Sequence, residues 1–170
     1  MNISSRLTAL RYKWTYNSLL YLNKNNSKTK KYQEEGLKLL EGKVDKLPQE
    51  MAFRPKFITQ SSCVKVFDKL YLFISKSNLK KPPSEKFDSF FHEIGHWLHF
   101  PQMPPVSECK EIWKNADTEK IKNDVSEYAI GKNDGREFVA EVFKGLVKGI
   151  KYDEYIMNLY RSLKGPNVRF

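Results

Sequence analysis

Residues 92–96 read His-Glu-Ile-Gly-His and are the part of the chain best suited to chemistry. On a helix, residues four apart lie on one face, so His92 and His96 can both offer Nε2 to a single ion. Two imidazoles at a site with an open position suit zinc. Glu93 stands beside the first histidine, where its carboxylate can take a proton from metal-activated water and pass it to a leaving amine. The spacing therefore predicts a zinc site with a general base.

The alternative is an amphipathic helix whose two histidines are satisfied by ordinary hydrogen bonds. The chain contains three histidines, and two of them stand at ligand spacing around a glutamate. Imidazoles buried without a partner are costly, and a metal ion is a natural partner for them. We therefore favour the metal site.

A third ligand has to come from elsewhere in the chain. His99 lies seven residues after His92, a rise of about 10 Å along a helix, whereas a zinc–nitrogen bond is only ~2.1 Å long. We expect His99 to be a packing residue near the helix end. His99 also occupies the glycine position of the longer pattern HExxHxxGxxH, and Gln102 the last histidine position, which argues against a metzincin.

Glu137 and Glu141 lie at i and i+4 in a second helical segment. Two carboxylates on one helix face repel each other unless positive charge lies nearby. A zinc ion bound by Glu137, with Glu141 orienting a ligand histidine, would relieve this repulsion. A solvated stripe neutralised by Lys144 and Lys148 is the alternative, and the spacing alone does not choose between them.

The elements that must position these residues form an α+β pattern. Pro82-Pro83 and Pro101 bracket the motif helix, which carries several aromatic residues. β-branched and aromatic runs predict a small antiparallel sheet. We expect helices at 3–22, Tyr32–Leu40, 106–122, 136–149 and 153–163, a helical turn at Gln49–Phe53, and a hairpin at 63–75. The expected organisation is a single domain over 1–170, with a basic helical part (1–56) followed by the sheet and zinc-binding core (57–170).

The strand Leu70–Ser75 stands shortly before the motif helix. An edge strand at this place could pair with an extended peptide substrate by strand addition. An internal strand with no free edge is the alternative that the sequence leaves open.

Charge is distributed unevenly along the 170 residues. The formal net charge is +10, and all of the excess lies before residue 86, so the half that contains the motif is neutral. This predicts an acidic peptide or particle surface as partner, with nucleic acid as the weaker possibility. No stretch is apolar enough for a membrane span. Basic residues interrupt any apolar N-terminal region, which predicts no secretory signal and a cytoplasmic protein.

The motif, the segment Val-Ser-Glu-Tyr-Ala (125–129) and Glu-Phe-Val-Ala-Glu (137–141) together resemble a known family. The stretch Lys69–Gly149 is similar to the catalytic domain of anthrax lethal factor and related Pro-Pro endopeptidases, and to zinc-peptidase-like proteins of phages and mobile elements. The resemblance implies a zincin-like fold and Zn²⁺ as cofactor.

The resemblance also implies roles for individual residues. His92, His96 and Glu137 would bind zinc, Glu93 would be the general base, and Tyr128 would stabilise the oxyanion. A core tyrosine is the alternative interpretation of Tyr128. Glu141 would orient a ligand histidine.

Two functions of different classes fit this sequence. The first is a zinc-dependent endopeptidase that hydrolyses peptide bonds with metal-activated water. The second is a phage-type structural, morphogenesis or binding module with a structural or vestigial zinc site, which would place the protein in a virion if a phage encodes it. A purely structural site has no need of Glu93, so we favour the peptidase.

Overall fold

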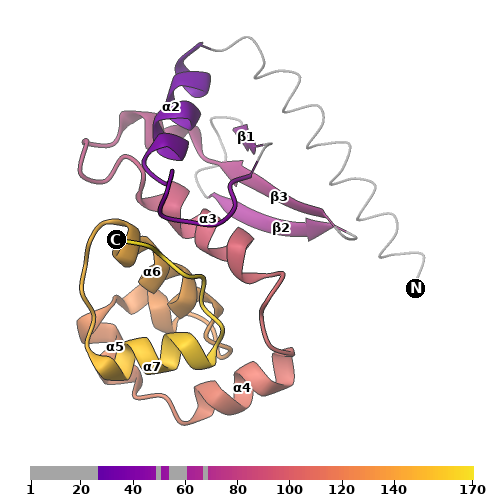
Figure 1. Cartoon of the computed structure of the whole chain (residues 1–170), viewed down its shortest axis with the longest axis vertical. Helices are drawn as coiled ribbons and strands as arrows, with labels where there is room; N and C mark the ends of the chain where they lie inside the picture. The colour runs from indigo at the N-terminus through magenta and orange to yellow at the C-terminus, as the bar shows by residue number, and fades with distance from the viewer. Residues whose placement is uncertain (1–26, 49–50, 54–60, 67–68) are drawn as a thin grey trace. The chain divides into compact units, whose positions relative to one another are not determined.

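The computed structural model describes residues 27–48, 51–53, 61–66 and 69–170, and their mixed content confirms the α+β prediction. Along the chain, the described elements are α2 (Ser27–Lys38), β1 (Met51–Phe53), β2 (Ser62–Val66), β3 (Lys69–Ile74), η1 (Lys76–Lys80), α3 (Asp88–His99), α4 (Val106–Lys114), α5 (Thr118–Asp124), η2 (Glu127–Ile130), α6 (Arg136–Val147) and α7 (Glu154–Ser162) (Figure 1). The predicted helix at 3–22 lies outside the described residues. Within them, no helix is both long and apolar enough to cross a bilayer.

The chain divides into two compact units. The N-terminal unit comprises Met1–Leu39 and Pro48–Phe90, and the C-terminal unit comprises Leu40–Leu47 and Phe91–Phe170. These bounds differ from the predicted parts 1–56 and 57–170, and the single-domain organisation stays a prediction. The sheet belongs to the first unit, and His92, His96 and every later residue belong to the second.

The sheet has the order β1-β3-β2 (Figure 1). β2 and β3 form the predicted hairpin, with an antiparallel register that runs from Ser62↔Phe73 to Val66↔Lys69. Of the two possibilities that the sequence leaves open for Leu70–Ser75, the structure shows the internal strand, because β1 pairs with β3 in parallel along its other side. Tyr71, Leu72, Phe73 and Ile74 are all buried. This continuous apolar run is typical of a central strand that is covered on both faces.

Two local predictions are corrected by the structure. Met51–Phe53 is a strand rather than part of a helical turn. The single helix expected at 106–122 is two helices, because Asp117 ends the connection after α4 and caps α5, its side chain accepting a hydrogen bond from the backbone N–H of Lys120 at 3.0 Å. The helices predicted at 136–149 and 153–163 are confirmed as α6 and α7.

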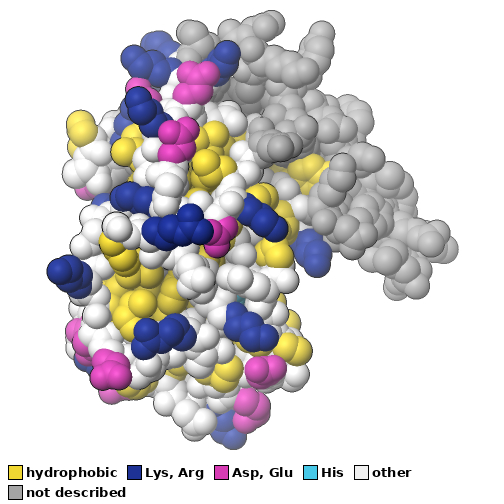
Figure 2. All heavy atoms as spheres, in the orientation of Figure 1, with side chains coloured by type: hydrophobic (Ala, Val, Ile, Leu, Met, Phe, Trp, Pro, Cys, Tyr) yellow, Lys and Arg dark blue, Asp and Glu magenta, His cyan; other side chains and the backbone are white. Residues whose placement is uncertain are grey.

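In the N-terminal unit, α2 packs through Tyr32, whose ring lies 4.8 Å from that of Phe87 and 5.9 Å from that of Phe90. Its hydroxyl donates to the Lys86 carbonyl at 2.8 Å. On the exposed side, Lys30 and Lys31 pair with Glu34 and Glu35. Figure 2 shows the two signs of charge interspersed over this helix. In the described part of the basic segment 1–56, carboxylates on α2 therefore neutralise some of the positive charge of its lysines.

In the C-terminal unit, Gly95 brings α3 and α6 close together. A Cβ built at Gly95 would lie 3.0 Å from the Cα of Ala140 and 3.1 Å from the Phe143 ring. Helix α6 is buried along most of its length, with Phe138, Val139, Ala140, Val142 and Phe143 fully inaccessible to solvent. The absence of a side chain at Gly95 is what allows the backbones to approach this closely.

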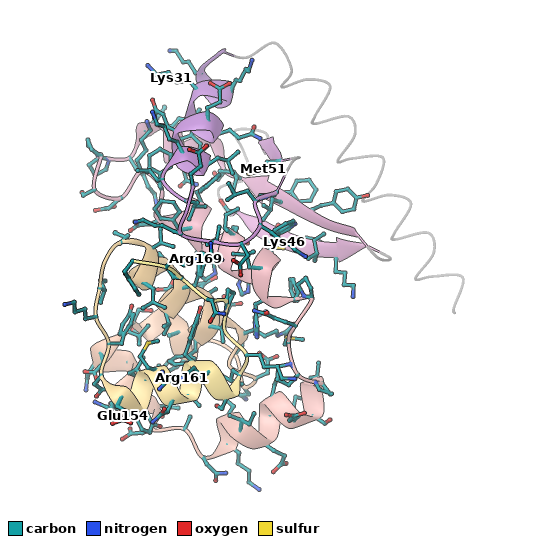
Figure 3. All side chains as sticks on the ribbon, viewed as in Figure 1. Lys31, Lys46, Met51, Glu154, Arg161 and Arg169 are labelled. Carbon is teal, nitrogen blue, oxygen red and sulfur yellow. The ribbon has the colours of Figure 1, made fainter. Side chains whose placement is uncertain are left out.

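The C-terminal tail is fixed by hydrogen bonds within the same unit. His99 Nε2 donates to the Leu163 carbonyl at 2.7 Å, and the Tyr160 hydroxyl donates to the Pro166 carbonyl at 2.6 Å. Farther along, the backbone N–H of Arg169 (labelled in Figure 3) donates to the Lys43 carbonyl at 2.9 Å, and its guanidinium pairs with Asp45. The prediction that His99 is a packing residue at the helix end is therefore confirmed.

Filling the contact at Gly95 should destabilise the protein. We expect Gly95→Val to lower the free energy of unfolding by about 1–3 kcal/mol, because the branched side chain overpacks the α3–α6 contact. Gly95→Ala should cost less, since the gain in helix propensity of about 1 kcal/mol offsets part of the strain. Urea unfolding measures both, and Lys110→Val on the exposed side of α4 is the control. Equal stabilities of Gly95→Val and the wild type would contradict the close contact.

His99 should make the protein less stable in acid. Burial lowers the pKa of His99 from its usual 6.5 to about 4, so the unfolded chain binds this proton first as the pH falls. The stabilising contribution is complete above pH 6.5 and declines toward pH 4, with about 2 kcal/mol lost at pH 5. His99→Gln keeps an N–H donor for Leu163 but cannot titrate. Urea unfolding at pH 7.5 and pH 5 should show a pH dependence about 2 kcal/mol smaller for this variant, and an unchanged dependence would refute the assignment.

Candidate metal centre

Helix α3 presents His92 and His96 on one face. The two Nε2 atoms lie 3.1 Å apart, and the ring centroids are 4.7 Å apart in an edge-on arrangement. The His92 side chain is 9% exposed and that of His96 is 11% exposed. As the spacing predicts, both imidazoles therefore direct the same nitrogen to one point.

Helix α6 brings Glu137 to the same point. Its Oε2 lies 3.2 Å from Nε2 of His92 and 3.2 Å from Nε2 of His96. The helix begins just before Glu137 because Gly135 adopts the left-handed conformation, with φ of 71°, and because the Asp134 carboxylate accepts the N–H of Arg136 at 3.2 Å. A Cβ at Gly135 would also lie 2.6 Å from a methyl carbon of Leu163. Glycine is therefore required where the chain enters α6.

The three ligand atoms are spaced as one metal ion would need. The corners of a tetrahedron around an ion with bonds of about 2.0–2.1 Å lie about 3.3–3.4 Å apart. The triangle formed by His92, His96 and Glu137 has sides of 3.1, 3.2 and 3.2 Å. These three residues are buried or half-buried, and they could in principle hold a metal.

Glu141 stands behind His92, one helical turn after Glu137. Its Oε1 accepts the Nδ1–H of His92 at 2.8 Å, and Oε2 accepts the hydroxyl proton of Ser126 at 2.8 Å. The Lys144 ammonium donates to both oxygens at 2.8 and 2.7 Å. Glu137 and Glu141 are 12% and 6% exposed, so they do not form a solvated stripe, although Lys144 does neutralise one of them.

Glu93 and Tyr128 lie close to this group. Glu93 is buried, and its charge raises the pKa of both His92 and Tyr128. The Tyr128 ring lies 5.3 Å from the His92 ring, edge-on, while the residue as a whole is 62% exposed. Tyr128 is therefore not a core tyrosine. Its hydroxyl stays protonated at neutral pH, because burial and the nearby carboxylates raise its pKa.

The charges of the group are strongly coupled in the metal-free protein. Burial alone would lower the pKa of His92, but its hydrogen bonds to Glu137 and Glu141 raise it to about 9. The pKa of His96 is lowered, because burial and the charge of His92 outweigh its bond to Glu137. Burial opposes ionisation of the carboxylates, yet the hydrogen bonds lower the pKa of Glu141 to about 2 and that of Glu137 further still. In the metal-free protein, the additional proton on His92 therefore supplies positive charge where a metal cation would otherwise supply it.

Two residues of the site are not revealed by sequence reasoning. In the sequence, Ser126 is only one residue of the Val-Ser-Glu-Tyr-Ala segment. Lys144 is only a possible positive partner for the carboxylates of Glu137 and Glu141. A serine immediately before a short turn is an ordinary cap signal, which does not reveal that the same hydroxyl reaches a carboxylate 15 residues later. The i+3 spacing of Lys144 to Glu141 is the one signal that could indicate their pairing.

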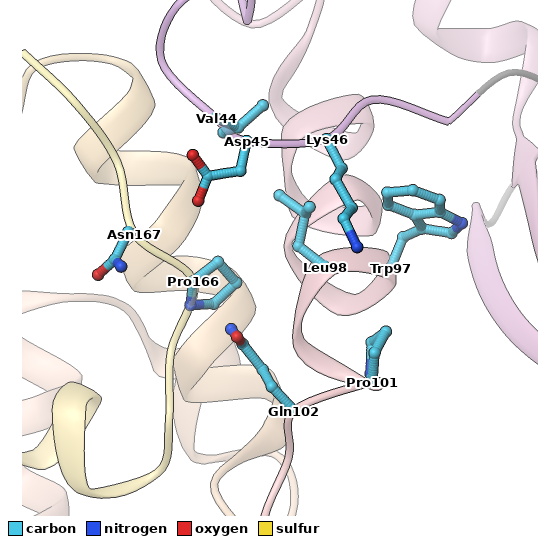
Figure 4. A pocket seen from close by; sticks show the side chains of 9 residues that line it. All are labelled: Val44, Asp45, Lys46, Trp97, Leu98, Pro101, Gln102, Pro166 and Asn167. Atoms are coloured by element: carbon cyan, nitrogen blue, oxygen red, sulfur yellow. The ribbon is translucent and has the colours of Figure 1, made fainter.

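A separate pocket of about 190 Å³ lies where α3 ends (Figure 4). The side chains of Trp97 and Leu98 line it from the helix, and Pro166 lines it from the tail. None of the three residues that could hold a metal lines this pocket. The other lining residues are Val44, Asp45, Lys46, Pro101, Gln102 and Asn167.

Comparisons with known proteins give no relatives for this chain: no protein-family model, no curated protein and no solved structure matches it. The chemistry of the metal centre therefore has to be inferred from its own residues.

Proposed function

We propose that the protein is a zinc-dependent endopeptidase. The observation that carries the proposal is the triangle of His92, His96 and Glu137, with sides of 3.1–3.2 Å, next to the buried carboxylate of Glu93. A structural zinc site usually has four protein ligands, whereas a catalytic site has three and leaves a position open. Three protein ligands with a neighbouring carboxylate therefore favour catalysis over a purely structural role.

The donor set favours zinc as the ion. Two imidazoles and one carboxylate are a ligand combination of catalytic zinc sites, and the separations of the ligand atoms suit tetrahedral bonds. Calcium and magnesium prefer sites made of oxygen ligands. When bound, zinc supplies a Lewis acid that activates water and polarises a carbonyl group.

The neighbouring side chains provide the remaining chemistry. Glu93 takes a proton from the attacking water and delivers it to the nitrogen of the leaving amine. Tyr128 donates its O–H to the oxygen on which negative charge develops. Glu141 holds the proton of His92 on Nδ1 and so leaves the Nε2 lone pair available as a ligand. The partial exposure of Tyr128 supports access of a peptide to this side of the group.

The wider assignment follows the family that the sequence resembles. A zincin-like fold, a peptide or protein substrate and a cytoplasmic or virion-associated location are parts of this proposal. The basic excess favours an acidic substrate surface, with nucleic acid as the weaker alternative. A phage-type structural, morphogenesis or binding module with a structural or vestigial zinc site is the competing function, and it requires no turnover.

Removing a ligand should abolish tight zinc binding. We expect the wild type to bind one zinc ion per chain, and Glu137→Ala and His92→Ala to lose it, because two remaining ligands hold zinc weakly. Metal analysis after dialysis measures the stoichiometry. Glu111→Ala on the exposed side of α4 is the matched control and should keep its zinc. Full retention of zinc by Glu137→Ala would show that the ligand set is wrongly assigned.

Removing the general base should separate binding from catalysis. Glu93→Gln should bind zinc as the wild type does but cleave peptides at least about 100-fold more slowly, because the amide cannot accept the proton. Cleavage of a diverse peptide mixture, followed by mass spectrometry with and without a chelator, measures this effect. Glu111→Gln should retain the wild-type rate.

The outcomes distinguish the two functions. A zinc-loaded wild type that yields no chelator-sensitive products would favour the binding module. A Glu93→Gln variant that cleaves at the wild-type rate would disprove the proposed mechanism even if the protein is a peptidase.

A further inference from the structure

We propose that Ser126 is a positioning residue that joins the turn carrying Tyr128 to the metal centre through a single hydroxyl group, and that Lys144 supports the same connection. This inference rests on the proposed zinc site and adds residues that neither the motif nor the family resemblance assigned. Neither residue would touch the metal or a substrate. Both would act through the carboxylate of Glu141.

The hydroxyl of Ser126 has two partners, and their chemistry fixes its orientation. It lies 2.8 Å from Oε2 of Glu141 and 3.2 Å from the backbone nitrogen of Ala129. An ionised carboxylate can only accept and an amide N–H can only donate, so the hydroxyl proton goes to Glu141 and a lone pair receives the Ala129 N–H. One side chain thereby satisfies a buried carboxylate and caps η2.

Glu141, which accepts the hydroxyl proton of Ser126, is also hydrogen-bonded to His92. Oε1 of Glu141 accepts the Nδ1–H of His92 at 2.8 Å, and Lys144 donates to both carboxylate oxygens. A carboxylate held from three directions has little freedom to rotate. The imidazole that it holds is therefore fixed with Nε2 toward His96 and Glu137.

Ser126 is also linked to Tyr128, because it caps the turn η2 that contains this tyrosine. Ser126 is the N-cap of this four-residue turn, and Ala129, whose N–H it accepts, is fully buried. The Tyr128 ring lies against the edge of the His92 ring at 5.3 Å. Tyr128 and His92 are thus held relative to each other both by this ring contact and through Ser126 and Glu141.

A purely structural cap would not require serine. Two other helices of the unit are capped by aspartate: Asp117 caps α5 and Asp153 caps α7. Aspartate is as good an N-cap as serine. At position 126, however, an aspartate would face the carboxylate of Glu141, where like charges repel and no proton is available to donate. Only a residue that accepts and donates at once serves both partners here.

Substitutions at position 126 test this role directly. Ser126→Thr keeps both hydrogen bonds and should bind zinc with the wild-type dissociation constant, within about twofold. Ser126→Asp keeps the cap and Ser126→Ala removes both bonds, and each should weaken zinc binding by about 10- to 100-fold. Competition with a chromogenic chelator measures the dissociation constant. Ser162→Ala, which removes an exposed hydroxyl at the end of α7, is the control and should match the wild type.

Lys144→Met provides an independent test. It should weaken zinc binding in the same range, while Lys114→Met on the exposed end of α4 should not.

Hydrogen exchange at the Ala129 amide gives a second readout. Zinc should slow this exchange in the wild type and in Ser126→Thr, but much less in Ser126→Ala, because the hydroxyl links the hydrogen bond of this amide directly to Glu141.

Wild-type zinc affinity in Ser126→Asp would overturn the proposal, since it would show that Ser126 is only a cap. Loss of affinity in Ser126→Thr equal to that in Ser126→Ala would also overturn it, because both hydrogen bonds remain possible in the threonine variant. Zinc affinity is measured without substrate. If the expected affinities are found but no peptide is cleaved, the proposed function fails and the positioning role stands.

Discussion

The C-terminal unit is organised around the convergence of three lone-pair atoms. Nε2 of His92, Nε2 of His96 and Oε2 of Glu137 lie 3.1–3.2 Å apart in a group that is about nine-tenths buried. Such atoms repel one another unless positive charge lies among them, and burial removes the water that would otherwise screen the repulsion. The fold must therefore hold α3 and α6 together against this repulsion or supply a cation. The close packing of α3 against α6 is visible in the structure, and in the metal-free protein the raised pKa of His92 allows a proton to supply positive charge at this point.

The close approach of the two helices depends on small residues and on apolar burial. Gly95 lies between the two candidate histidine ligands and faces the backbone of Ala140, midway between Glu137 and Phe143. The separation of the helices at this point sets how far the Glu137 carboxylate is from both imidazoles. The buried aromatic and aliphatic side chains of α6 supply the apolar contact that offsets the cost of burying charges beside them.

The sequence predicts the local parts of this arrangement better than its connections. The spacing of His92 and His96 is a property of one helix, as is that of Glu137 and Glu141, so the helical period alone places each pair on one face. The sequence does not decide whether the strand at Leu70–Ser75 is an edge or an internal strand, because a run of apolar residues does not show how many neighbours it has, and β1 is only three residues long. The role of Ser126 depends on a contact across 15 residues, which no helical or strand period encodes.

Counting the buried charges explains why a divalent cation suits this centre. Glu93, Glu137 and Glu141 are buried or nearly so and carry three negative charges, while Lys144 returns one positive charge through its hydrogen bonds to Glu141. Lys132 lies 4.0 Å from Glu137 but is more than half exposed, so water screens most of its effect. A proton on His92 compensates only part of the remainder, whereas a divalent ion at the triangle compensates all of it. Among the described residues, Lys144 therefore supplies part of the positive charge that the centre requires, and a divalent cation bound as proposed would supply the rest.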